Sequence, residues 1–276
     1  MKISILLPYK ENFSPTYPGA VSLFVYETSR ISKYKNNIIV YGNTNYKNIF
    51  KINYHNINLD KSRFQSISKK YIENFIKIEK KYNSDLLEVH NRPNYLNYLY
   101  KFMKNKKYIL YFHNDPLTMV GSKNVAERKF LLKICYRILF NSNWSKKRFL
   151  EGLENKFINS DKLQVVFQSA NKSKIDLNNK EKMITFVGKL NRAKGYDIFG
   201  KAVIKILNKY KKWTANVIGD EQRDKINFTH SRLINHGFLK HDKVIDIYKK
   251  TNIAVVCSRW EEPFGRTSLE ASSNGC

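Results

Sequence analysis

Short apolar runs alternate with longer amphipathic stretches along the sequence, and this alternation limits the possible folds more than any other feature. Such runs, bounded by turn residues, are typical of buried parallel strands, and the stretches between them are typical of crossover helices. We predict strands at residues 3–7, 37–41, 86–90, 108–112, 138–141 and 163–167. The helices predicted between them span residues 20–34, 64–82, 95–104, 125–136 and 145–153. The first part of the chain is therefore predicted to be an α/β domain.

A second unit of the same kind follows a polar, aperiodic segment at residues 171–182. Beyond that segment we predict strands at 183–187, 214–218 and 253–257, with helices at 195–210, at 243–249 and from 267 onward. A length of 276 residues suits two domains of ordinary size, and we place them at residues 1–175 and 176–276. The sequence stops just past a helix, where a parallel sheet normally continues. We therefore expect the second domain to be incomplete in this chain.

The segment from Cys257 to Gly275 carries the most informative pattern of residues. It places Glu262 in a loop after a predicted strand, then Gly265 at a turn, then Glu270 in the opening turns of a helix. A helix N-terminus offers unpaired N–H groups and a partial positive charge, so a phosphate can lie against the backbone at Gly265, Arg266 and Thr267. Glu270 can then accept hydrogen bonds from ribose hydroxyls, and Glu262 from the hydroxyls of a sugar. The alternative is that the two acids are ordinary residues favoured by the helix dipole.

The same string resembles the signature of glycosyltransferase family 4, retaining enzymes of the GT-B fold. That signature has two Glu residues separated by seven others, with Pro-Phe-Gly after the first and Leu-Glu-Ala around the second. Both parts match residue for residue, at Glu262-Pro-Phe-Gly265 and Leu269-Glu-Ala271.

A second segment, residues 184–197, resembles the family's strand, Gly-Arg-Leu turn and Lys-Gly helix start. In the family the Arg and Lys of this segment hold the donor diphosphate. Here Lys194 matches the Lys, but Lys189 stands where Arg is usual, and Lys lacks the bidentate fork of Arg. Arg192 is a candidate to compensate, and a solvated loop is the alternative for all three residues.

The first half contains weaker candidates. Gly19, before a predicted helix, can let the backbone approach the donor phosphate or the acceptor, although a plain helix start explains it equally well. His113 lies just past a predicted strand, where open α/β sheets bind ligands, and is similar in placement to a family His that contacts the transferred sugar or its phosphate. His90 and Arg92 follow another strand, and for His90 a structural hydrogen bond is the alternative.

The resemblance implies an α/β GT-B protein with two facing Rossmann-like domains with parallel sheets, the first on the acceptor side and the second binding the nucleotide sugar. It implies retaining transfer from a UDP or GDP sugar to a saccharide or lipid-linked acceptor, in cell-surface polysaccharide or lipopolysaccharide synthesis, with Glu262 and His113 as catalytic residues. No Asp-x-Asp motif or metal-ligand spacing occurs, and the three cysteines are far apart, so we predict no essential metal, no separate cofactor and no disulfide framework. A catalytically inactive fragment of such an enzyme is one alternative.

The charge of the chain leaves two further questions open. Fifty Lys and Arg residues against twenty-three Asp and Glu residues give a formal net charge of +27, which attracts any polyanion. A basic nucleic-acid-binding protein is the rival class, but the Tyr and Phe residues fall within apolar strand and helix patterns, so we expect no nucleic-acid partner.

The helix predicted at residues 64–82 has an apolar face flanked by lysines, which favours contact with an anionic membrane. The residues of that face are Phe64, Ile67, Tyr71, Ile72, Phe75 and Ile78. An ordinary helix packed on the sheet is the alternative. No run approaches the ~20 apolar residues that span a bilayer, so we predict a cytoplasmic protein, peripheral on the inner face of the cell membrane.

Overall fold

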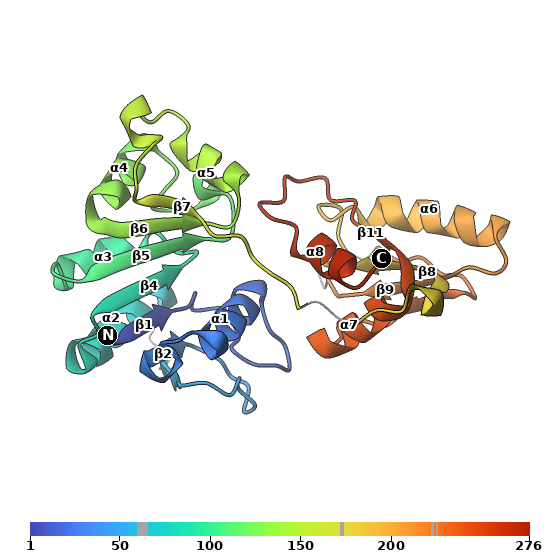
Figure 1. Ribbon diagram of the computed structural model, residues 1–276, viewed down its shortest axis with the longest axis horizontal. Helices are drawn as coiled ribbons and strands as arrows, with labels where there is room; N and C mark the ends of the chain where they lie inside the picture. Colours follow the sequence, from blue (N-terminus) through green and yellow to red (C-terminus); the bar gives the residue numbers. More distant parts are fainter. Residues whose placement is uncertain (60–65, 172–173, 222–223, 225) are drawn as a thin grey trace. The chain divides into compact units, whose positions relative to one another are not determined.

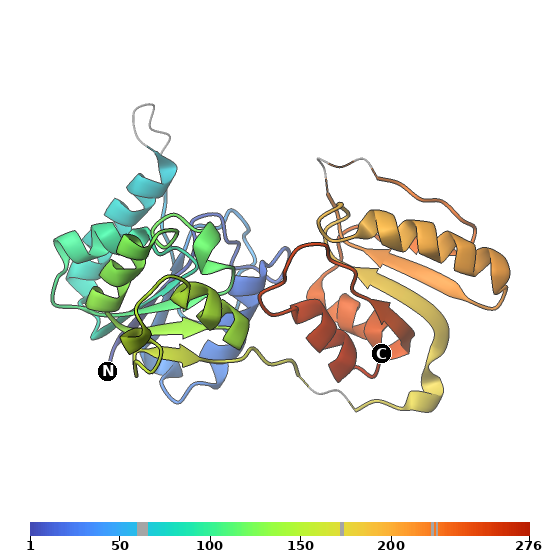
Figure 2. The same cartoon turned by 90° about the horizontal axis from the view of Figure 1, so that it is seen from above.

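The computed structural model describes residues 1–59, 66–171, 174–221, 224 and 226–276. It divides into two compact units, Met1–Gln168 and Ser169–Cys276, each with its own parallel sheet covered by helices (Figures 1 and 2). The division falls at Gln168, ahead of residue 175, where the sequence analysis placed the end of the first domain.

Unit 1 contains a seven-stranded sheet among its described residues, in the order β3-β2-β1-β4-β5-β6-β7, and every neighbouring pair is parallel. The strands are β1 (Ile3–Leu6), β2 (Ile38–Gly42), β3 (Tyr54–Asn56), β4 (Leu86–His90), β5 (Lys107–Phe112), β6 (Cys135–Phe140) and β7 (Leu163–Val165). The helices are α1 (Ala20–Ile31), α2 (Ile67–Tyr82), α3 (Tyr95–Phe102), α4 (Val125–Ile134) and α5 (Asn143–Leu150). The predicted alternation of strands and helices is confirmed in this unit.

The two faces of this sheet are covered by different helices because alternate residues of a strand point to opposite sides. In β1, Ile3 and Ile5 pack in the cluster that contains Phe24 of α1. Leu6, the last residue of β1, packs in the larger cluster, which contains Phe75 of α2 and further side chains of α3, α4 and α5.

Most of the apolar face of helix α2 packs in this larger cluster. Tyr71, Ile72 and Phe75 are each at most 1% exposed, and the Tyr71 hydroxyl donates to the Leu7 carbonyl at 2.9 Å. The expectation that this face contacts a membrane is corrected for Tyr71, Ile72 and Phe75, because these side chains are part of the protein interior; Ile67 is exposed, and Phe64 lies outside the described residues. None of the helices described here is both long and apolar enough to cross a membrane.

Unit 2 contains a four-stranded parallel sheet among its described residues, in the order β10-β9-β8-β11. The strands are β8 (Glu181–Val187), β9 (Thr214–Ile218), β10 (Leu233–Asn235) and β11 (Thr251–Val255). The helices are α6 (Tyr196–Lys209), α7 (His241–Lys250) and α8 (Arg266–Ser273). Helix α6 packs with the cluster around Phe186, and α7 and α8 pack with the cluster around Ile218 on the other face.

Both sheets reverse their strand order at one point. In unit 1 the chain builds outward from β1 through β2 to β3 and then returns to the other side of β1 with β4; in unit 2, β8 and β11 have the same relation. Ligands of open α/β sheets bind outside the carboxyl ends of the strands at such a switch point. The loops that follow β1 and β4, and those that follow β8 and β11, are therefore where a site is expected.

Candidate functional site

The loops after β8 and β11 touch each other through their backbones. Gly195, the residue before α6, has φ of +72°, and a Cβ there would lie 1.9 Å from the Cys257 carbonyl oxygen. The Arg259 amide donates to the Ala193 carbonyl at 2.9 Å. Glycine is needed at position 195 both for its left-handed backbone and for this close approach. The start of α6 and the loop after β11 thus have a fixed mutual position.

This contact brings together two of the predicted site residues, Lys194 and Glu262. Lys194 Nζ forms an ion pair with Glu262 Oε1, which also accepts a hydrogen bond from Ser258 Oγ at 2.5 Å. The same ammonium lies 4.9 Å from the centre of the Trp260 ring, within cation–π range. Burial by itself raises the pKa of Glu262, but the hydrogen bonds from Lys194 and Ser258 outweigh it and hold the pKa below its ordinary value.

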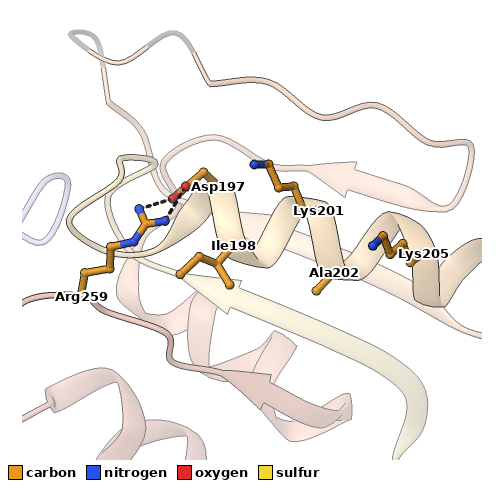
Figure 3. A pocket seen from close by; sticks show the side chains of 6 residues that line it. All are labelled: Asp197, Ile198, Lys201, Ala202, Lys205 and Arg259. Carbon is orange, nitrogen blue, oxygen red and sulfur yellow. Dashed lines mark hydrogen bonds and ion pairs between the residues drawn. The ribbon is translucent and has the colours of Figure 1, made fainter.

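A second ion pair, which the sequence analysis missed, joins the same two loops. The two terminal guanidinium nitrogens of Arg259 each donate to the Asp197 carboxylate at 2.8 Å, which makes a bidentate pair. Figure 3 shows this pair at one end of a shallow cavity of about 340 Å³ along α6. Hydrogen bonding by Arg259 lowers the pKa of Asp197. The rest of this cavity is lined by Ile198, Lys201, Ala202 and Lys205. We assign the Arg259–Asp197 pair to holding the loop after β11 against α6.

Helix α8 begins as the sequence predicts, with Gly265 at φ of +79° and no side chain capping the helix. Glu270 is 6% exposed, and its Oε1 accepts from Arg266 Nε at 2.7 Å and from His241 Nε2 at 2.9 Å. Burial raises the pKa of Glu270, but the bond to His241 and the charge of Arg266 outweigh it, so the pKa lies below its usual range. The carboxylate is therefore an acceptor at neutral pH. Thr267 lies in the first turn of the same helix.

The basic residues after β8 lie at the surface. Lys189 and Arg192 are both exposed. The Arg192 amide donates to Asp224 Oδ2 at 3.4 Å, and the Asn191 side chain donates to Glu221 Oε2 at 3.2 Å. These two acids follow β9 and were not predicted. They hold the turn in place, while contact of Lys189 or Arg192 with a phosphate stays a prediction.

In unit 1 the two predicted histidines are in direct contact. His90 Nδ1 and His113 Nε2 lie 2.8 Å apart, and the residues are 0% and 7% exposed. The Asn91 side-chain oxygen accepts from the His113 amide at 3.1 Å, and Gln168 Nε2 lies 3.0 Å from His113 Nδ1. Arg92 donates to the Asn91 carbonyl at 2.8 Å. Both ring nitrogens of His113 therefore have partners within unit 1.

Gly19 has an internal neighbour. A Cβ at this position would lie 1.9 Å from Glu11 Oε1, and the same oxygen accepts from the Ser22 amide at 2.9 Å. Burial raises the pKa of Glu11. The start of α1 is thus occupied by a carboxylate of this chain, so the predicted approach of a ligand phosphate at Gly19 requires Glu11 to move.

Among the residues that the structure describes, no group of three or more His, Cys, Asp and Glu side chains could hold a metal ion. Cys135, Cys257 and Cys276 are free thiols.

The second part of the sequence matches a known family of proteins. Residues 167–276 match the family model described as "Glycosyl transferases group 1". An uncharacterized glycosyltransferase of Methanocaldococcus jannaschii, MJ1607, is 28% identical over 137 residues, which is 42% of this chain and 35% of that protein. An uncharacterized 42.6 kDa protein in the cps region of Klebsiella pneumoniae is 32% identical over 133 residues, 47% of this chain and 34% of that protein. In each case the matched segment is about a third of the relative's length.

Solved structures match the chain over its whole length. The crystal structure of Anabaena Alr3699/HepE in complex with UDP and glucose has a TM-score of 0.72 and 16% identity, and the match covers 100% of this chain and 79% of that one. The apo form of the lipopolysaccharide outer core galactosyltransferase WaaB has a TM-score of 0.61 and 17% identity, with the same coverage. The predicted fold class, α/β of the GT-B type with parallel sheets, is confirmed by these matches and by the two sheets described above.

Proposed function

We propose that this chain is a glycosyltransferase that binds a nucleoside-diphosphate sugar, with UDP or GDP as the nucleotide, in unit 2. The observation that carries the proposal is the ion pair between Lys194 and Glu262, formed by the loops at the carboxyl ends of β8 and β11. Those loops flank the switch point of the sheet, where such folds bind nucleotides. The match of residues 167–276 to a glycosyltransferase family covers the same loops.

The residues suit the separation of charge in this reaction. The diphosphate gains negative charge as the glycosidic bond breaks, and fixed positive charge near it lowers the barrier. Lys194 and the partial positive charge at the N-terminus of α8 supply positive charge, and Gly265, the residue before α8, provides no side-chain cap. Lys189 is assigned to the same diphosphate.

Two carboxylates recognise the hydroxyls of the donor. The pKa values of Glu262 and Glu270 are both lowered, so each is ionised at neutral pH and accepts hydrogen bonds. We assign Glu262 to the transferred sugar and Glu270 to the ribose. Retention of anomeric configuration rests on the sequence resemblance alone.

We further propose that the acceptor is a saccharide or a lipid-linked saccharide in cell-surface polysaccharide or lipopolysaccharide synthesis. The relative from the cps region and the fold shared with the galactosyltransferase WaaB support this assignment. We place the reaction at the cytoplasmic face of the membrane, where such acceptors are found and where the anionic surface attracts a protein with a net charge of +27.

Nucleic-acid binding is the weaker candidate. Stacking on bases requires accessible aromatic rings; Tyr71 and Phe112 lie in the core of unit 1, whereas Tyr136 and Phe167 are exposed. The match of residues 167–276 to a glycosyltransferase family favours the first candidate over this one.

A thermal-shift screen of the chain against UDP, GDP, ADP and their sugars tests the proposal. A ligand at 100 times its dissociation constant adds ~2.7 kcal/mol to the free energy of unfolding. A rise in melting temperature with one nucleotide and its sugars supports donor binding. If all nucleotides leave the melting temperature unchanged, and salt-sensitive binding to single-stranded DNA is found instead, the proposal is wrong.

A further inference from the structure

Three connecting segments of unit 1 lie side by side at the edge of the sheet where its strands begin. Residues 80–85 lead from α2 into β4, residues 101–107 lead from α3 into β5, and residues 133–137 lead from α4 into β6. The strands β4, β5 and β6 are parallel neighbours, so all three segments reach the same edge (Figure 1). This edge is opposite the carboxyl ends of the strands, where the candidate ligand loops of unit 1 lie.

Side-chain contacts join the three segments into one surface. Lys106 Nζ donates to Asn83 Oδ1 at 3.0 Å, which links the first segment to the second. Lys107 Nζ lies 5.7 Å from the centre of the Tyr136 ring, which links the second segment to the third. We call the exposed surface of these segments the amino-edge patch.

The amino-edge patch is strongly basic. Eight of the eighteen residues in the three segments are Lys or Arg, and Asp85 is the one acid. Its carboxylate accepts from the Lys2 amide at 2.7 Å, and Lys106 is paired with the buried Glu79 at 3.1 Å. The exposed lysines of the patch are Lys80, Lys81, Lys101, Lys104, Lys107 and Lys133. Within the part of the chain that the structure describes, none of these six forms an ion pair, so their charge is open to an external anion.

Two exposed aromatic side chains lie among these cations. Phe102 is 49% exposed and Tyr136 is 48% exposed. Lys80 Nζ lies 5.9 Å from the centre of the Phe102 ring, and Arg137 Cζ lies 4.5 Å from the centre of the Tyr136 ring. Aromatic rings flanked by Lys and Arg are typical of protein surfaces at the level of lipid headgroups, where the ring enters the interface and the cations meet anionic lipids. A nucleobase needs an open ring face on which to stack, and here cations lie over both rings, which favours a bilayer over a nucleic acid.

We propose that the amino-edge patch binds unit 1 to an anionic lipid bilayer, with its lysines among the headgroups and with Phe102 and Tyr136 in the interface. The inference rests on the proposed function for placing the reaction at a membrane. It involves only the end of α2, most of whose apolar face packs in the interior. The six residues of β5 separate this edge from the carboxyl edge by about 20 Å. The acceptor that suits this arrangement is a lipid-linked saccharide whose reacting sugar extends away from the headgroups.

Co-sedimentation with vesicles tests whether the chain binds such a surface. The chain should bind vesicles made of equal parts phosphatidylglycerol and phosphatidylcholine, and the binding should weaken as salt is added, because salt screens the attraction. Vesicles of phosphatidylcholine alone should bind much less. Equal binding to both kinds of vesicle, or binding to neither, would overturn the proposal.

Paired charge variants test whether the patch is the surface that binds. The double variant Lys101→Gln, Lys104→Gln should lower the partition coefficient on anionic vesicles roughly thirtyfold, about fivefold for each lysine. The control is Lys201→Gln with Lys205→Gln, which removes the same charge from exposed residues of α6. Circular dichroism confirms that both double variants are folded. Equal losses in the two would show that net charge alone drives binding, and would overturn the assignment to the patch.

An aromatic variant tests insertion of the rings into the interface. Tyr136→Ser should weaken vesicle binding roughly threefold or more, because part of its exposed apolar area no longer leaves water. The matched control is Tyr210→Ser in unit 2, since Tyr210 is also 48% exposed and has Lys209 Nζ 5.5 Å from its ring centre. Equal binding by the two variants would contradict insertion. Stronger binding of the chain to single-stranded DNA than to anionic vesicles, lost in the Lys101, Lys104 variant, would make the patch a nucleic-acid surface and overturn the proposal.

The melting temperature with UDP-glucose separates this inference from the proposed function. A chain that is stabilised by UDP-glucose but does not bind anionic vesicles would overturn the membrane surface and leave donor binding intact. Patch-dependent vesicle binding without stabilisation by any nucleotide sugar would support the membrane surface and count against donor binding.

Discussion

Replacing Glu270 by Gln isolates the charge of the most buried carboxylate in the candidate donor site. Gln has nearly the same shape and keeps a carbonyl oxygen, so Arg266 and His241 can still donate, at 2.7 and 2.9 Å in the native protein. What is lost is the negative charge. The variant therefore measures charge rather than packing.

The magnitude follows from the two bonds. A hydrogen bond to a charged group contributes ~1.5 to 3 kcal/mol, and a neutral one ~0.5 to 1.5 kcal/mol. Each bond should lose ~1 kcal/mol, so the variant should lose ~2 kcal/mol of the free energy of unfolding of unit 2, or about thirtyfold in its equilibrium constant. Donor affinity or turnover should also fall by roughly ten- to a hundredfold, because the ribose loses a charged acceptor.

The stability difference depends on pH in a definite direction. The pKa of Glu270 in the folded protein lies below its ordinary value of 4.5. A depressed pKa stabilises the fold above the unfolded pKa, and this stabilisation is lost as pH falls through the folded pKa. The difference between wild type and Glu270→Gln should be full at neutral pH and shrink progressively below about pH 4.5.

Urea unfolding in a Trp144→Phe background measures this difference, because the two remaining tryptophans, Trp213 and Trp260, both lie in unit 2. Glu261→Gln is the matched control, since Glu261 is exposed and adjacent to the motif. The control should change stability by less than ~0.5 kcal/mol and leave donor use near normal. Equal effects of the two substitutions, or normal kinetics of a folded Glu270→Gln, would refute the reasoning.

Two further variants test contacts inside each unit. Gly195→Ala should destabilise unit 2 by more than Gly237→Ala. Both glycines have positive φ, which costs an alanine ~1 to 2 kcal/mol, but of the two only Gly195 would also place a Cβ against a backbone oxygen, at 1.9 Å. Equal urea midpoints for the two variants would contradict this. In unit 1, Glu79→Ala should cost ~1 to 3 kcal/mol, because it leaves the buried Ser4 hydroxyl, at 2.6 Å, without its acceptor and removes the partly buried Lys106 ammonium's ion-pair partner, at 3.1 Å. Lys69, which forms an exposed ion pair with Glu73, gives the comparison. Lys69→Ala should change the free energy of unfolding of unit 1, followed by Trp144 fluorescence, by less than ~1 kcal/mol.

Periodicity predicted the main strands and helices because buried strands and amphipathic helices leave separate patterns in the sequence. It missed β3 (Tyr54–Asn56) and β10 (Leu233–Asn235), which are three residues long and too short to show a period. Periodicity also predicted the apolar face of α2, but not the surface against which that face packs. An apolar face looks the same in the sequence whether it meets a sheet or a membrane, and only the packing of Tyr71 and Phe75 identifies the sheet.

The candidate site was predictable where the residues lie within one loop and not where they meet across the fold. The motif around Glu262 and the turn at Lys194 were each readable, and the strand order brings them together. His241 is 29 residues from Glu270 and Arg259 is 62 residues from Asp197, so no local spacing connects them. Gln168, which follows β7 and contacts His113, has no sequence signal at all, because a single polar residue at such a position normally faces solvent.

The central claim is that the loops after β8 and β11 bind a nucleoside diphosphate through Lys194, and calorimetric titration with UDP and GDP tests it most directly. The variant is Lys194→Ala, and the control is Lys201→Ala, which removes the same charge from an exposed residue on α6. Losing a charged hydrogen bond to phosphate should weaken binding by ~1.5 to 3 kcal/mol, or roughly ten- to a hundredfold, at Lys194. Lys201→Ala should change the affinity by less than about threefold. Equal affinities for wild type and a folded Lys194→Ala, or equal losses in both variants, would contradict the account.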